Sequence, residues 1–403
     1  MKILHVFYST LPSTKGGDIR SRDVIESQAA AGLDVLALSS PFQPPAKAGA
    51  TVEEFGGISY HRSFDETGDL RISEQDKGLK VKMRKAAKLF SFGDVVTDLA
   101  RREKPDVIHA HSTFFCAFAA HRAARKLGLP LVYEVRSLWE ERAMMKVPSL
   151  HTRSIARAVR ALETRAMRSA DHIVVISEGL RRDVIARGIP ADRITMIGNG
   201  ANLSRVTDHS VSVSGKAPSD WVFAYIGSLS DIEGLDLLIL AVRKLRVQGW
   251  TNPVQLHGDG PAIDDLRAQA AGVAGITFHG RFRPEAAPTI YAAVDVIVNP
   301  RRQSSLAEKV TPLKPLEAMA WRKPVISSSV TGMLELVRDG ETGFIFDADD
   351  AQSLAEALQR LTDRAETVPA VVERAWQFIK NERSWHANAQ KYKTLYAQLT
   401  GNA

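Results

Sequence analysis

The chain has 403 residues, of which 44% are hydrophobic and 25% are charged, and its only cysteine is Cys116. This composition is ordinary for a globular protein and excludes a disordered or collagen-like chain, while the length suggests two to three domains. A single cysteine excludes an internal disulfide and a four-cysteine zinc site, which favours a reducing compartment. No run of 18 apolar residues occurs, and the N-terminal apolar run is too short for a signal peptide, so we expect a soluble protein.

The net charge of +7 is unevenly distributed. Residues 1–205 contain 32 Lys and Arg against 23 Asp and Glu, a net of +9, whereas the rest of the chain contains 21 against 23, a net of −2. The excess positive charge therefore lies on the first half. It indicates an anionic partner there, such as nucleic acid, a membrane surface or a phosphorylated substrate.

The first half alternates short apolar runs with amphipathic stretches, which predicts parallel strands joined by right-handed helical crossovers. A strand over 2–8 precedes a glycine loop and a helix over about 18–31. Further strands are expected at 34–39, 107–110, 131–135 and 172–176. Residues 41–76 are less regular, and the Ser-rich stretch 202–220 has the composition of an interdomain linker.

The same alternation begins again in the second half. Strands are expected at 221–226, 254–257, 276–279, 294–299, 324–328 and 343–346, and helices at 234–248, 351–361 and about 370–399. The sequence thus predicts two doubly wound α/β domains that face each other across a cleft at the carboxyl ends of both sheets. Their expected bounds are 1–205 and 206–380, with a C-terminal helix over 381–403 that returns to the first domain.

Gly16 and Gly17 follow the first strand and precede a helix. Without Cβ atoms the backbone can approach a phosphate or a sugar closely, and the helix N-terminus favours an anion. The sequence has neither G-x-G-x-x-G nor G-x-x-x-x-G-K-[ST], which disfavours a dinucleotide dehydrogenase and a P-loop NTPase. The alternative interpretation is a simple tight turn.

His109 and His111 end a strand, where alternation places both side chains on one face. Zinc would need further ligands that no cysteine and no H-E-x-x-H pattern supplies, so no metal site is expected. A hydrogen-bonding role toward a substrate is the preferred interpretation for His111, and a structural histidine is the alternative. Arg136 also follows a strand and is a candidate to contact an anionic group.

The most informative stretch is 299–320, in which a polar loop joins a strand to a helix that begins at Pro315. The loop carries four cations, Arg301, Arg302, Lys309 and Lys314. Cations, free backbone N–H groups and a helix N-terminus together suit a diphosphate. Glu317, in the first turn of the helix, is placed to accept hydrogen bonds from ribose hydroxyls, and the alternative is an acidic residue that caps a helix.

Several segments, in the same order, resemble the family 4 retaining glycosyltransferases of the GT-B architecture. They are MKILHV with Gly16-Gly17, DVIHAH, ISEGLRRDVIARGIPADRITMIGNGAN, YIGSLSDIEGLDLLILAV, HGDGP, FHGRF and LEAMAWRKPVISSSVTGMLELVRDGETGFIF. EVRSLWE, EGLD and EKVTPLKPLEAMA further resemble a bacterial subgroup associated with exopolysaccharide assembly. The resemblance implies two facing Rossmann-like domains, the first (1–205) binding the acceptor and the second (206–380) binding a nucleotide-sugar.

The resemblance also implies transfer of a sugar from a nucleotide-diphospho-sugar with retention of configuration, and without a metal or other cofactor. Three family features fall on this chain, the ribose-binding glutamate at Glu317, the sugar-contacting histidine at His111 and the glycine-rich first loop at Gly16-Gly17. The turn Gly258-Asp259-Gly260-Pro261 falls where the family packs the edge of the base. The acceptor side is expected to include His109 and Arg136.

The chain departs from the family pattern at the diphosphate. Ser228 and Glu233 stand where the family has an arginine and a lysine. The replacement charge is therefore expected from Arg301, Lys309 or Lys314. A second family glutamate would fall on Lys309, with Glu308 one residue earlier. Either Glu308 reaches the sugar through a one-residue bulge, or that contact is absent.

The stretch 77–88 (KGLKVKMRKAAK) contains six basic residues and no acid, with apolar residues at helical spacing. One interpretation is a helix that lies on anionic lipid and brings the enzyme to a lipid-linked acceptor, and the other is a core-facing stripe with a solvated basic back. Arg153, Arg157 and Arg160 form a second basic helical face.

We therefore expect a cytoplasmic glycosyltransferase that acts on a lipid-linked or polysaccharide precursor. Contact with the inner face of the cytoplasmic membrane, through the N-terminal domain, depends on which interpretation of the basic helices holds. A small-molecule acceptor and a sugar-nucleotide epimerase are the alternatives. Nucleic acid is not expected as a partner, because the sequence lacks helix-turn-helix, zinc-finger and RNA-recognition signatures.

Overall fold

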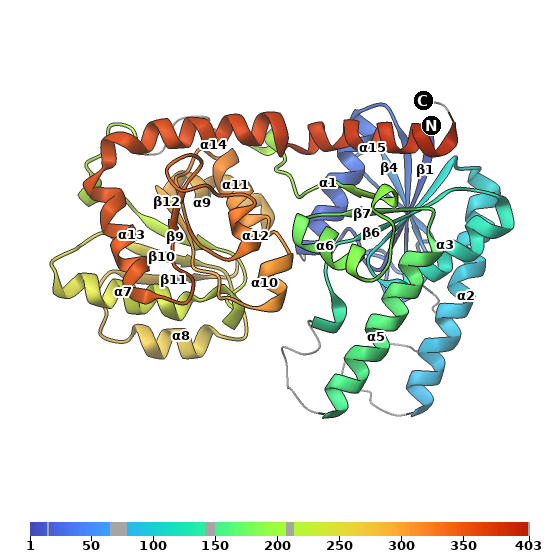
Figure 1. Cartoon of the computed structure of the whole chain (residues 1–403), viewed down its shortest axis with the longest axis horizontal. Helices are drawn as coiled ribbons and strands as arrows, with labels where there is room; N and C mark the ends of the chain where they lie inside the picture. The colour runs from blue at the N-terminus through green and yellow to red at the C-terminus, as the bar shows by residue number, and fades with distance from the viewer. Residues whose placement is uncertain (14–15, 65–78, 142–149, 207–212, 402–403) are drawn as a thin grey trace. The chain divides into compact units, whose positions relative to one another are not determined.

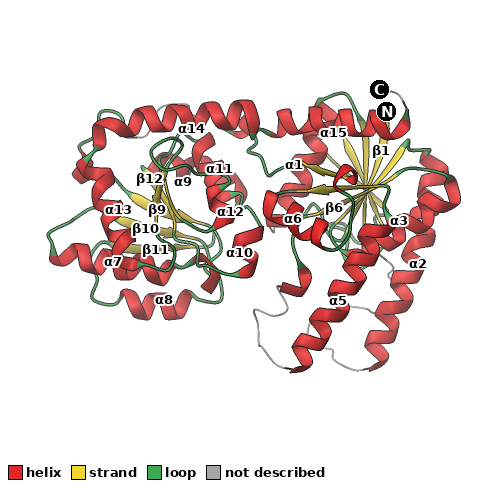
Figure 2. Ribbon diagram, in the orientation of Figure 1, coloured by secondary structure: helices red, strands yellow, loops and turns green. Residues whose placement is uncertain are grey.

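The computed structural model describes residues 1–13, 16–64, 79–141, 150–206 and 213–401. The chain forms two compact units, Met1–Ile197 together with Asn388–Ala403, and Gly198–Ala387 (Figure 1). Each unit has a twisted, largely parallel sheet with helices packed on it (Figure 2). This is the doubly wound α/β class that the alternation of strands and helices predicts.

Among the described residues, the sheet of the first unit has eight strands in the order β3-β4-β2-β1-β5-β6-β7-β8. They are β1 (Lys2–Phe7), β2 (Asp34–Ser39), β3 (Val52–Phe55), β4 (Ile58–Arg62), β5 (Val107–His111), β6 (Leu131–Val135), β7 (His172–Val175) and β8 (Ile194–Met196). The β3–β4 pair is antiparallel and lies in the stretch expected to be irregular. The sequence feature that indicates this hairpin is the Gly56-Gly57 pair. Both glycines have positive φ angles, as the two central residues of a type I′ hairpin turn require.

The helices of the first unit lie on both faces of its sheet. They are α1 (Gly16–Ala30), α2 (Leu79–Glu103), α3 (Phe114–Leu127), α5 (Leu150–Ser169), α6 (Glu178–Ala186) and most of α15 (Trp385–Thr400). The connection through α1 runs along the sheet in the direction opposite to those through α2, α3, α5 and α6. Right-handed crossovers therefore place α1 on one face and these four helices on the other. A hydrogen bond from Gln28 to Tyr396 places α15 beside α1.

The sheet of the second unit is parallel, with the order β11-β10-β9-β12-β13-β14 among the described residues. Its strands are β9 (Phe223–Ile226), β10 (Val254–His257), β11 (Ile276–Gly280), β12 (Val296–Asn299), β13 (Val325–Ser328) and β14 (Phe344–Phe346). Its helices are α7 (Leu235–Val247), α8 (Ile263–Ala270), α9 (Ala287–Ala293), α10 (Ser305–Lys309), α11 (Lys314–Ala320), α12 (Thr331–Leu334), α13 (Ala351–Asp363) and α14 (Val368–Glu382). Alternate residues of β9, β12, β13 and β14 face two separate hydrophobic clusters, as in a sheet buried on both faces.

The units divide after Ile197, earlier than the boundary that the Ser-rich composition indicates. Residues 213–220 belong to the second unit, since Val213 is buried in its core and Lys216 Nζ lies 2.5 Å from Asp295 Oδ1. The final helical stretch is also divided, into α14 and α15, and residues 388–403 join the first unit. The side chains of the basic stretch from 77 to 86 lie outside the described residues.

Candidate functional site

Three histidines meet at the carboxyl ends of β1 and β5 in the first unit. His109 and His111 project from the same face of β5, as alternation predicts, with ring centroids 4.0 Å apart. The strand register pairs His5 with His109, and His5 Nδ1 lies 2.8 Å from His111 Nε2. All three rings are buried, and no more than 1% of any of these residues is exposed. His109 has no exposed surface, and its Nδ1 lies 2.6 Å from the Tyr396 hydroxyl oxygen.

Glu134 of β6 is the acidic centre of this cluster. Its carboxylate accepts hydrogen bonds from Arg20, Arg136 and Tyr392, and it is fully buried. Burial alone would raise the pKa of Glu134, but the two guanidinium groups outweigh burial and hold that pKa well below its ordinary value. Glu134 is therefore ionised and ties β6 to α1 and α15. Glu134 is not among the residues expected from the sequence, although an acidic residue two positions before Arg136 at a strand end is a recognisable signal.

Arg136 connects the acidic centre to the glycine loop. Its Nε donates to Glu134 Oε1 (2.7 Å), Nη1 to Ser21 Oγ (2.7 Å), and Nη2 to His111 Nδ1 (2.5 Å). A Cβ added to Gly17 would meet nothing within 4 Å, so open space, and not a packing constraint, lies beside the first turn of α1. The structure thus brings together Arg136, His111 and Gly17, with Gly16 as the first residue of α1.

The ring nitrogens of His5, His109 and His111 lie within 4.8 Å of one another, which is compact enough for a metal ion. However, Arg136 donates to His111 Nδ1, so the hydrogen of the neutral His111 ring is on Nε2 and points at His5. A metal would need a lone pair where this hydrogen lies. The three rings therefore fit a hydrogen-bonded cluster and do not fit a metal site.

Acid should destabilise the protein through these histidines. Burial lowers the pKa of His5 from 6.5 to about 4, and it holds the pKa values of His109 and His111 well below 6.5. Between pH 6.5 and about pH 4, His5 binds a proton in the unfolded chain but not in the folded chain. The free energy of unfolding should therefore fall as the pH falls from 6.5 toward 4, by on the order of 3 kcal/mol for His5 alone. Urea denaturation at several pH values measures this, and a constant midpoint would contradict buried neutral rings.

In the second unit, two turns lie backbone to backbone at the carboxyl ends of β9 and β10. Gly227 and Gly258 have φ angles of 151° and 141°, which only glycine adopts without strain. A Cβ on Gly258 would overlap the carbonyl oxygen of Gly227, and one on Gly260 would overlap that of Leu229. The predicted residues Ser228, Gly258, Asp259 and Gly260 are therefore neighbours, and Ser228 and Asp259 are exposed.

Lys314, the first residue of α11, covers the first of these turns. Its side chain lies against Gly227, and its Nζ is 2.8 Å from Glu233 Oε1 and 5.3 Å from the ring centroid of Tyr225. Burial alone would raise the pKa of Glu233, but the Lys314 ammonium, followed by the Arg301 guanidinium, outweighs burial and lowers that pKa. The ammonium group of Lys314, from α11, thus lies beside Glu233, which occupies the position where the family has a lysine.

Arg301 is a buried guanidinium, and its charge lowers the pKa of the nearby Glu233. Only 7% of the residue is exposed, its Nε has no hydrogen-bond partner, and no described carboxylate forms a salt bridge with it. Its neighbour Arg302, by contrast, binds Asp236 and Asp349. At the end of β12, Asn299 is 1% exposed and both of its amide atoms lack a partner. Such unsatisfied groups are rare in native proteins and concentrate at functional sites.

Asn299→Leu should stabilise the fold, because it replaces two unsatisfied buried atoms with apolar atoms of similar size. We expect the free energy of unfolding to rise by about 1–2 kcal/mol, measured by urea denaturation. Asn252→Leu is the matched control. Asn252 is equally buried, but its Nδ2 donates to the carbonyls of Pro218 (2.7 Å) and Trp221 (3.0 Å), so this substitution should destabilise. A less stable Asn299→Leu variant would show that the amide is satisfied in solution.

The acidic residues near the loop have different surroundings. α10 is helical through Glu308 and Lys309 without a bulge, and the Glu308 carboxylate accepts hydrogen bonds from the amide and hydroxyl groups of Thr331. This engagement favours the alternative in which Glu308 does not contact the sugar. Glu317 lies in the first turn of α11, as expected, and its charge adds to burial in raising the pKa of Tyr291.

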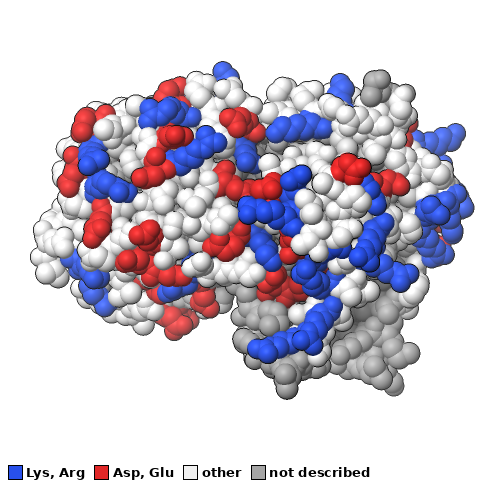
Figure 3. All heavy atoms as spheres, in the orientation of Figure 1, with Lys and Arg blue, Asp and Glu red and all other residues white. Residues whose placement is uncertain are grey.

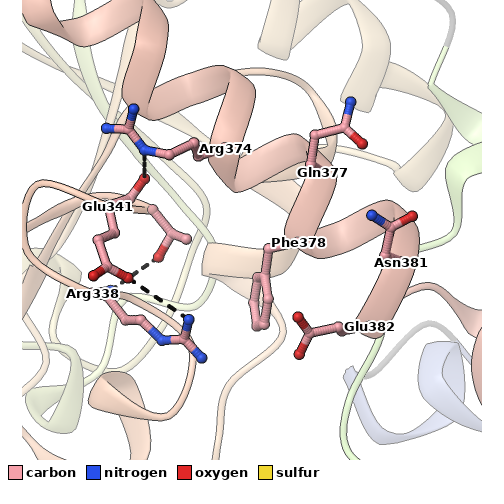
Figure 4. A pocket seen from close by; sticks show the side chains of 8 residues that line it. Arg338, Glu341, Arg374, Gln377, Phe378, Asn381 and Glu382 are labelled. Atoms are coloured by element: carbon pink, nitrogen blue, oxygen red, sulfur yellow. Dashed lines mark hydrogen bonds and ion pairs between the residues drawn. The ribbon is translucent and has the colours of Figure 1, made fainter.

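A shallow pocket of 450 Å³ lies elsewhere in the second unit (Figure 4). It is lined by Arg338, Glu341, Thr342, Arg374, Gln377, Phe378, Asn381 and Glu382. Part of this lining immediately precedes β14, so the pocket is at the amino end of the sheet, whereas ligands of such sheets bind at the carboxyl end. Arg374 is occupied by the carbonyl groups of Gly340 and Glu341. This pocket is therefore separate from the candidate site.

Two largely parallel α/β units, the second with close glycine turns and cations at the carboxyl end of its sheet, form the architecture expected of a two-domain GT-B glycosyltransferase. Family comparison agrees, since residues 15–200 match the glycosyl transferase 4-like domain and residues 220–364 match glycosyl transferases group 1. The two matches together extend over most of the chain. The protein belongs to the GT-B glycosyltransferases, which confirms the family expected from its sequence segments.

Similar proteins include several glycosyltransferases. The α-D-kanosaminyltransferase of Streptomyces kanamyceticus is 24% identical over 313 residues, which cover 74% of this chain and 79% of that protein. A D-inositol 3-phosphate glycosyltransferase of Rhodococcus opacus is 25% identical over 403 residues, which cover 93% of this chain and 87% of that protein. The shared property of these relatives is glycosyl transfer.

Solved structures show the same fold. Sucrose-phosphate synthase from Thermosynechococcus elongatus has a TM-score of 0.77 at 19% identity, with all of both chains covered. Anabaena HepE in complex with UDP has a TM-score of 0.73 at 17% identity, with 99% of this chain and 100% of that chain covered. The fold predicted from the sequence, GT-B with two Rossmann-like domains, is thus confirmed.

Proposed function

We propose that this protein transfers a sugar from a nucleotide-diphospho-sugar to a hydroxyl acceptor, with retention of configuration and without a metal ion. The observation that carries the proposal is Arg301, a buried guanidinium at the carboxyl end of β12 that forms no salt bridge with a described residue and whose Nε has no hydrogen-bond partner among them. A diphosphate would supply the missing acceptors, because guanidinium groups bind phosphate oxygens with well-matched geometry. HepE, which shares the fold, has been solved with UDP and with UDP-glucose, and this supports a nucleotide-sugar donor.

The charges of this site suit the leaving group. Breaking the bond between the anomeric carbon and the phosphate oxygen sends the bonding electron pair to the diphosphate and leaves an oxocarbenium-like sugar. Arg301 and Lys314 would stabilise that growing negative charge more in the transition state than in the ground state. The acceptor oxygen bonds to the anomeric carbon from the same face, and its proton passes to the leaving phosphate oxygen. This route needs no enzyme carboxylate as nucleophile, and the engagement of Glu308 by Thr331 agrees with that.

The nucleotide would occupy the two glycine turns and the first turn of α11. Gly227 and Gly258 bring two stretches of backbone close together, and exposed Ser228 and Asp259 flank them. Glu317 would accept hydrogen bonds from the ribose hydroxyls. Lys309, at the end of α10, is the remaining cation of the loop.

We propose that the acceptor binds the first unit, at Gly17, Arg136 and His111, and that it is a lipid-linked or polysaccharide precursor of the kind used in exopolysaccharide assembly. None of the described helices combines the length and apolarity needed to cross a bilayer. Peripheral contact of a cytoplasmic enzyme with anionic lipid would instead use α5, over which Lys and Arg side chains form a band (Figure 3). α5 exposes Arg153 and Arg157 together with apolar Ile155 (44% exposed) and Leu162 (40% exposed), and basic and apolar groups together favour a lipid surface.

A thermal-shift screen against UDP, GDP, ADP and their sugars tests the donor. A bound nucleotide raises Tm by mass action, and at a hundred times Kd the stabilisation is about 2.7 kcal/mol. Glu317→Ala should abolish the shift, whereas Lys314→Ala should keep most of it and lower turnover. Nucleoside diphosphate release that depends on an acceptor distinguishes a transferase from an epimerase. The proposal fails if no nucleoside diphosphate shifts Tm and the protein instead binds nucleic acid.

A further inference from the structure

Buried polar groups of the first unit form a chain of hydrogen bonds whose two ends face Glu134, and no single stretch of sequence contains it; we call this path the ring. The ring runs from Arg136 to His111 (2.5 Å) and from His111 to His5 (2.8 Å). It continues from His5 to Gln28 of α1 (3.1 Å) and from Gln28 to Tyr396 of α15 (3.3 Å). It then passes from Tyr396 to His109 (2.6 Å), whose Nε2 lies 3.6 Å from Glu134 Oε2. This last contact is longer than a hydrogen bond, and Glu134 in turn accepts a hydrogen bond from Arg136, so both ends of the chain of hydrogen bonds face the Glu134 carboxylate.

The direction of these hydrogen bonds follows from Arg136, because a guanidinium group only donates and lies closer to His111 Nδ1 (2.5 Å) than Glu134 Oε1 does (3.5 Å). Arg136 donates to His111 Nδ1, so the neutral His111 carries its hydrogen on Nε2 and donates to His5 Nδ1. His5 then carries its hydrogen on Nε2 and donates to Gln28 Oε1.

The second half of the ring follows from the amide of Gln28. Its Nε2 donates to the Tyr396 oxygen, and the Tyr396 hydroxyl donates to the nearer of its two acceptors, His109 Nδ1 at 2.6 Å and not Gln28 Oε1 at 3.5 Å. His109 consequently carries its hydrogen on Nε2, on the side that faces the ionised carboxylate of Glu134. Arg136 at one end and Glu134 at the other therefore favour the same tautomers, with hydrogen on Nε2 of all three histidines.

We infer that Gln28 and Tyr396 are positioning residues that, acting through His5, hold His111 in the tautomer with its hydrogen on Nε2. In this tautomer the Nδ1 lone pair of His111 faces Arg136, which also reaches Ser21 and the first turn of α1. A ligand that draws Arg136 toward itself meets His111 as a hydrogen-bond acceptor. His111 then suits a hydroxyl group of a sugar and repels a phosphate oxygen, which has no hydrogen to donate. The identity of this ligand rests on the proposed function.

The C-terminal helix therefore contributes more to the first unit than apolar packing. Tyr392 and Tyr396 are both fully buried, but they reach different partners, Glu134 and His109 respectively. Tyr396 alone belongs to the path that leads to His111. This difference provides a matched pair of substitutions on one helix.

NMR of the full-length protein labelled with ¹⁵N-histidine tests the inference, because two-bond ¹H–¹⁵N correlations distinguish the two tautomers. Substitution of each histidine in turn assigns the signals. In the unsubstituted protein, His5, His109 and His111 should all carry hydrogen on Nε2. Tyr396→Phe and Gln28→Leu should each produce mixed tautomers in the interrupted ring. They should lower kcat for transfer by about tenfold with the KM for the donor unchanged, because the donor site lies in the other unit.

Tyr392→Phe is the control for loss of a buried hydroxyl from α15, and it should leave the three tautomers unchanged. The inference is overturned if His111 of the unsubstituted protein carries hydrogen on Nδ1, or if Tyr392→Phe mixes the tautomers as much as Tyr396→Phe does. The spectrum of the unsubstituted protein decides the first point even if a variant fails to fold. Correct tautomers in a protein that transfers no sugar would contradict the proposed function and support the ring.

Discussion

Arg301→Met is expected to lower kcat for sugar transfer by about 10²- to 10³-fold, the loss typical of removing one donor aimed at developing negative charge. Arg301 lies at the end of β12 near Glu233 and Lys314, and it has no salt bridge among the described residues. Because a buried unpaired charge costs free energy, methionine should not lower the free energy of unfolding. Acceptor-dependent release of nucleoside diphosphate measures kcat, and urea denaturation measures stability.

Arg302→Met is the matched control for this experiment. Arg302 is the next residue, but its guanidinium group already binds Asp236 and Asp349. Its loss should cost stability through these ion pairs and should change kcat far less than the loss of Arg301. Equal turnover of the Arg301→Met variant and the unsubstituted protein would remove Arg301 from the site, and with it the main support for the diphosphate.

Glu134→Gln is expected to destabilise the first unit by about 3–5 kcal/mol, as removal of one partner from a buried ion pair does. The substitution preserves the shape of the side chain but removes the carboxylate charge that pairs with the buried guanidinium groups of Arg20 and Arg136. The lowered pKa of Glu134 predicts the pH dependence. Its stabilising effect is complete above the ordinary pKa of a glutamate and is lost as the pH falls through the lowered value in the folded protein. Urea denaturation at neutral and acidic pH measures both effects.

Glu163→Gln is the corresponding control, because Glu163 is also a buried glutamate of the first unit. Its carboxyl group accepts hydrogen bonds from the Tyr133 hydroxyl and the Phe114 amide, and burial raises its pKa to about 7. A neutral amide should replace it at a cost of less than about 1.5 kcal/mol. If the two substitutions cost the same, ion pairing is not what stabilises the centre at Glu134.

The periodic features of the chain were predictable from the sequence. Buried parallel strands are short apolar runs, and these gave the positions of β1, β2, β5, β6, β7 and all the strands of the second unit. The short, polar strands β3 and β4 carry no such pattern and were missed. The Ser-rich stretch was misleading for a similar reason, because its composition does not reveal that Val213 is buried in the second unit.

The candidate sites were predictable only where neighbouring residues form them. The loop from Asn299 to Glu317 is one continuous stretch, so its cations and the first turn of its helix could be predicted together. The sequence could not predict that Arg302 forms salt bridges and that Arg301 forms none among the described residues. That difference depends on Asp236 and Asp349, which come from elsewhere in the unit.

Length and composition indicated a multidomain α/β protein, and charge indicated that its first half meets an anionic partner, because strand periodicity and charge are properties of the chain itself. The surroundings of each charge depend on folding. Arg136 and His111 were candidates from the start, yet their hydrogen-bond partners come from α1 and α15, and Tyr396 is 287 residues from His109. Whether a cation is paired, and which nitrogen of a histidine carries hydrogen, follows from contacts between distant segments, and these exist only in the folded protein.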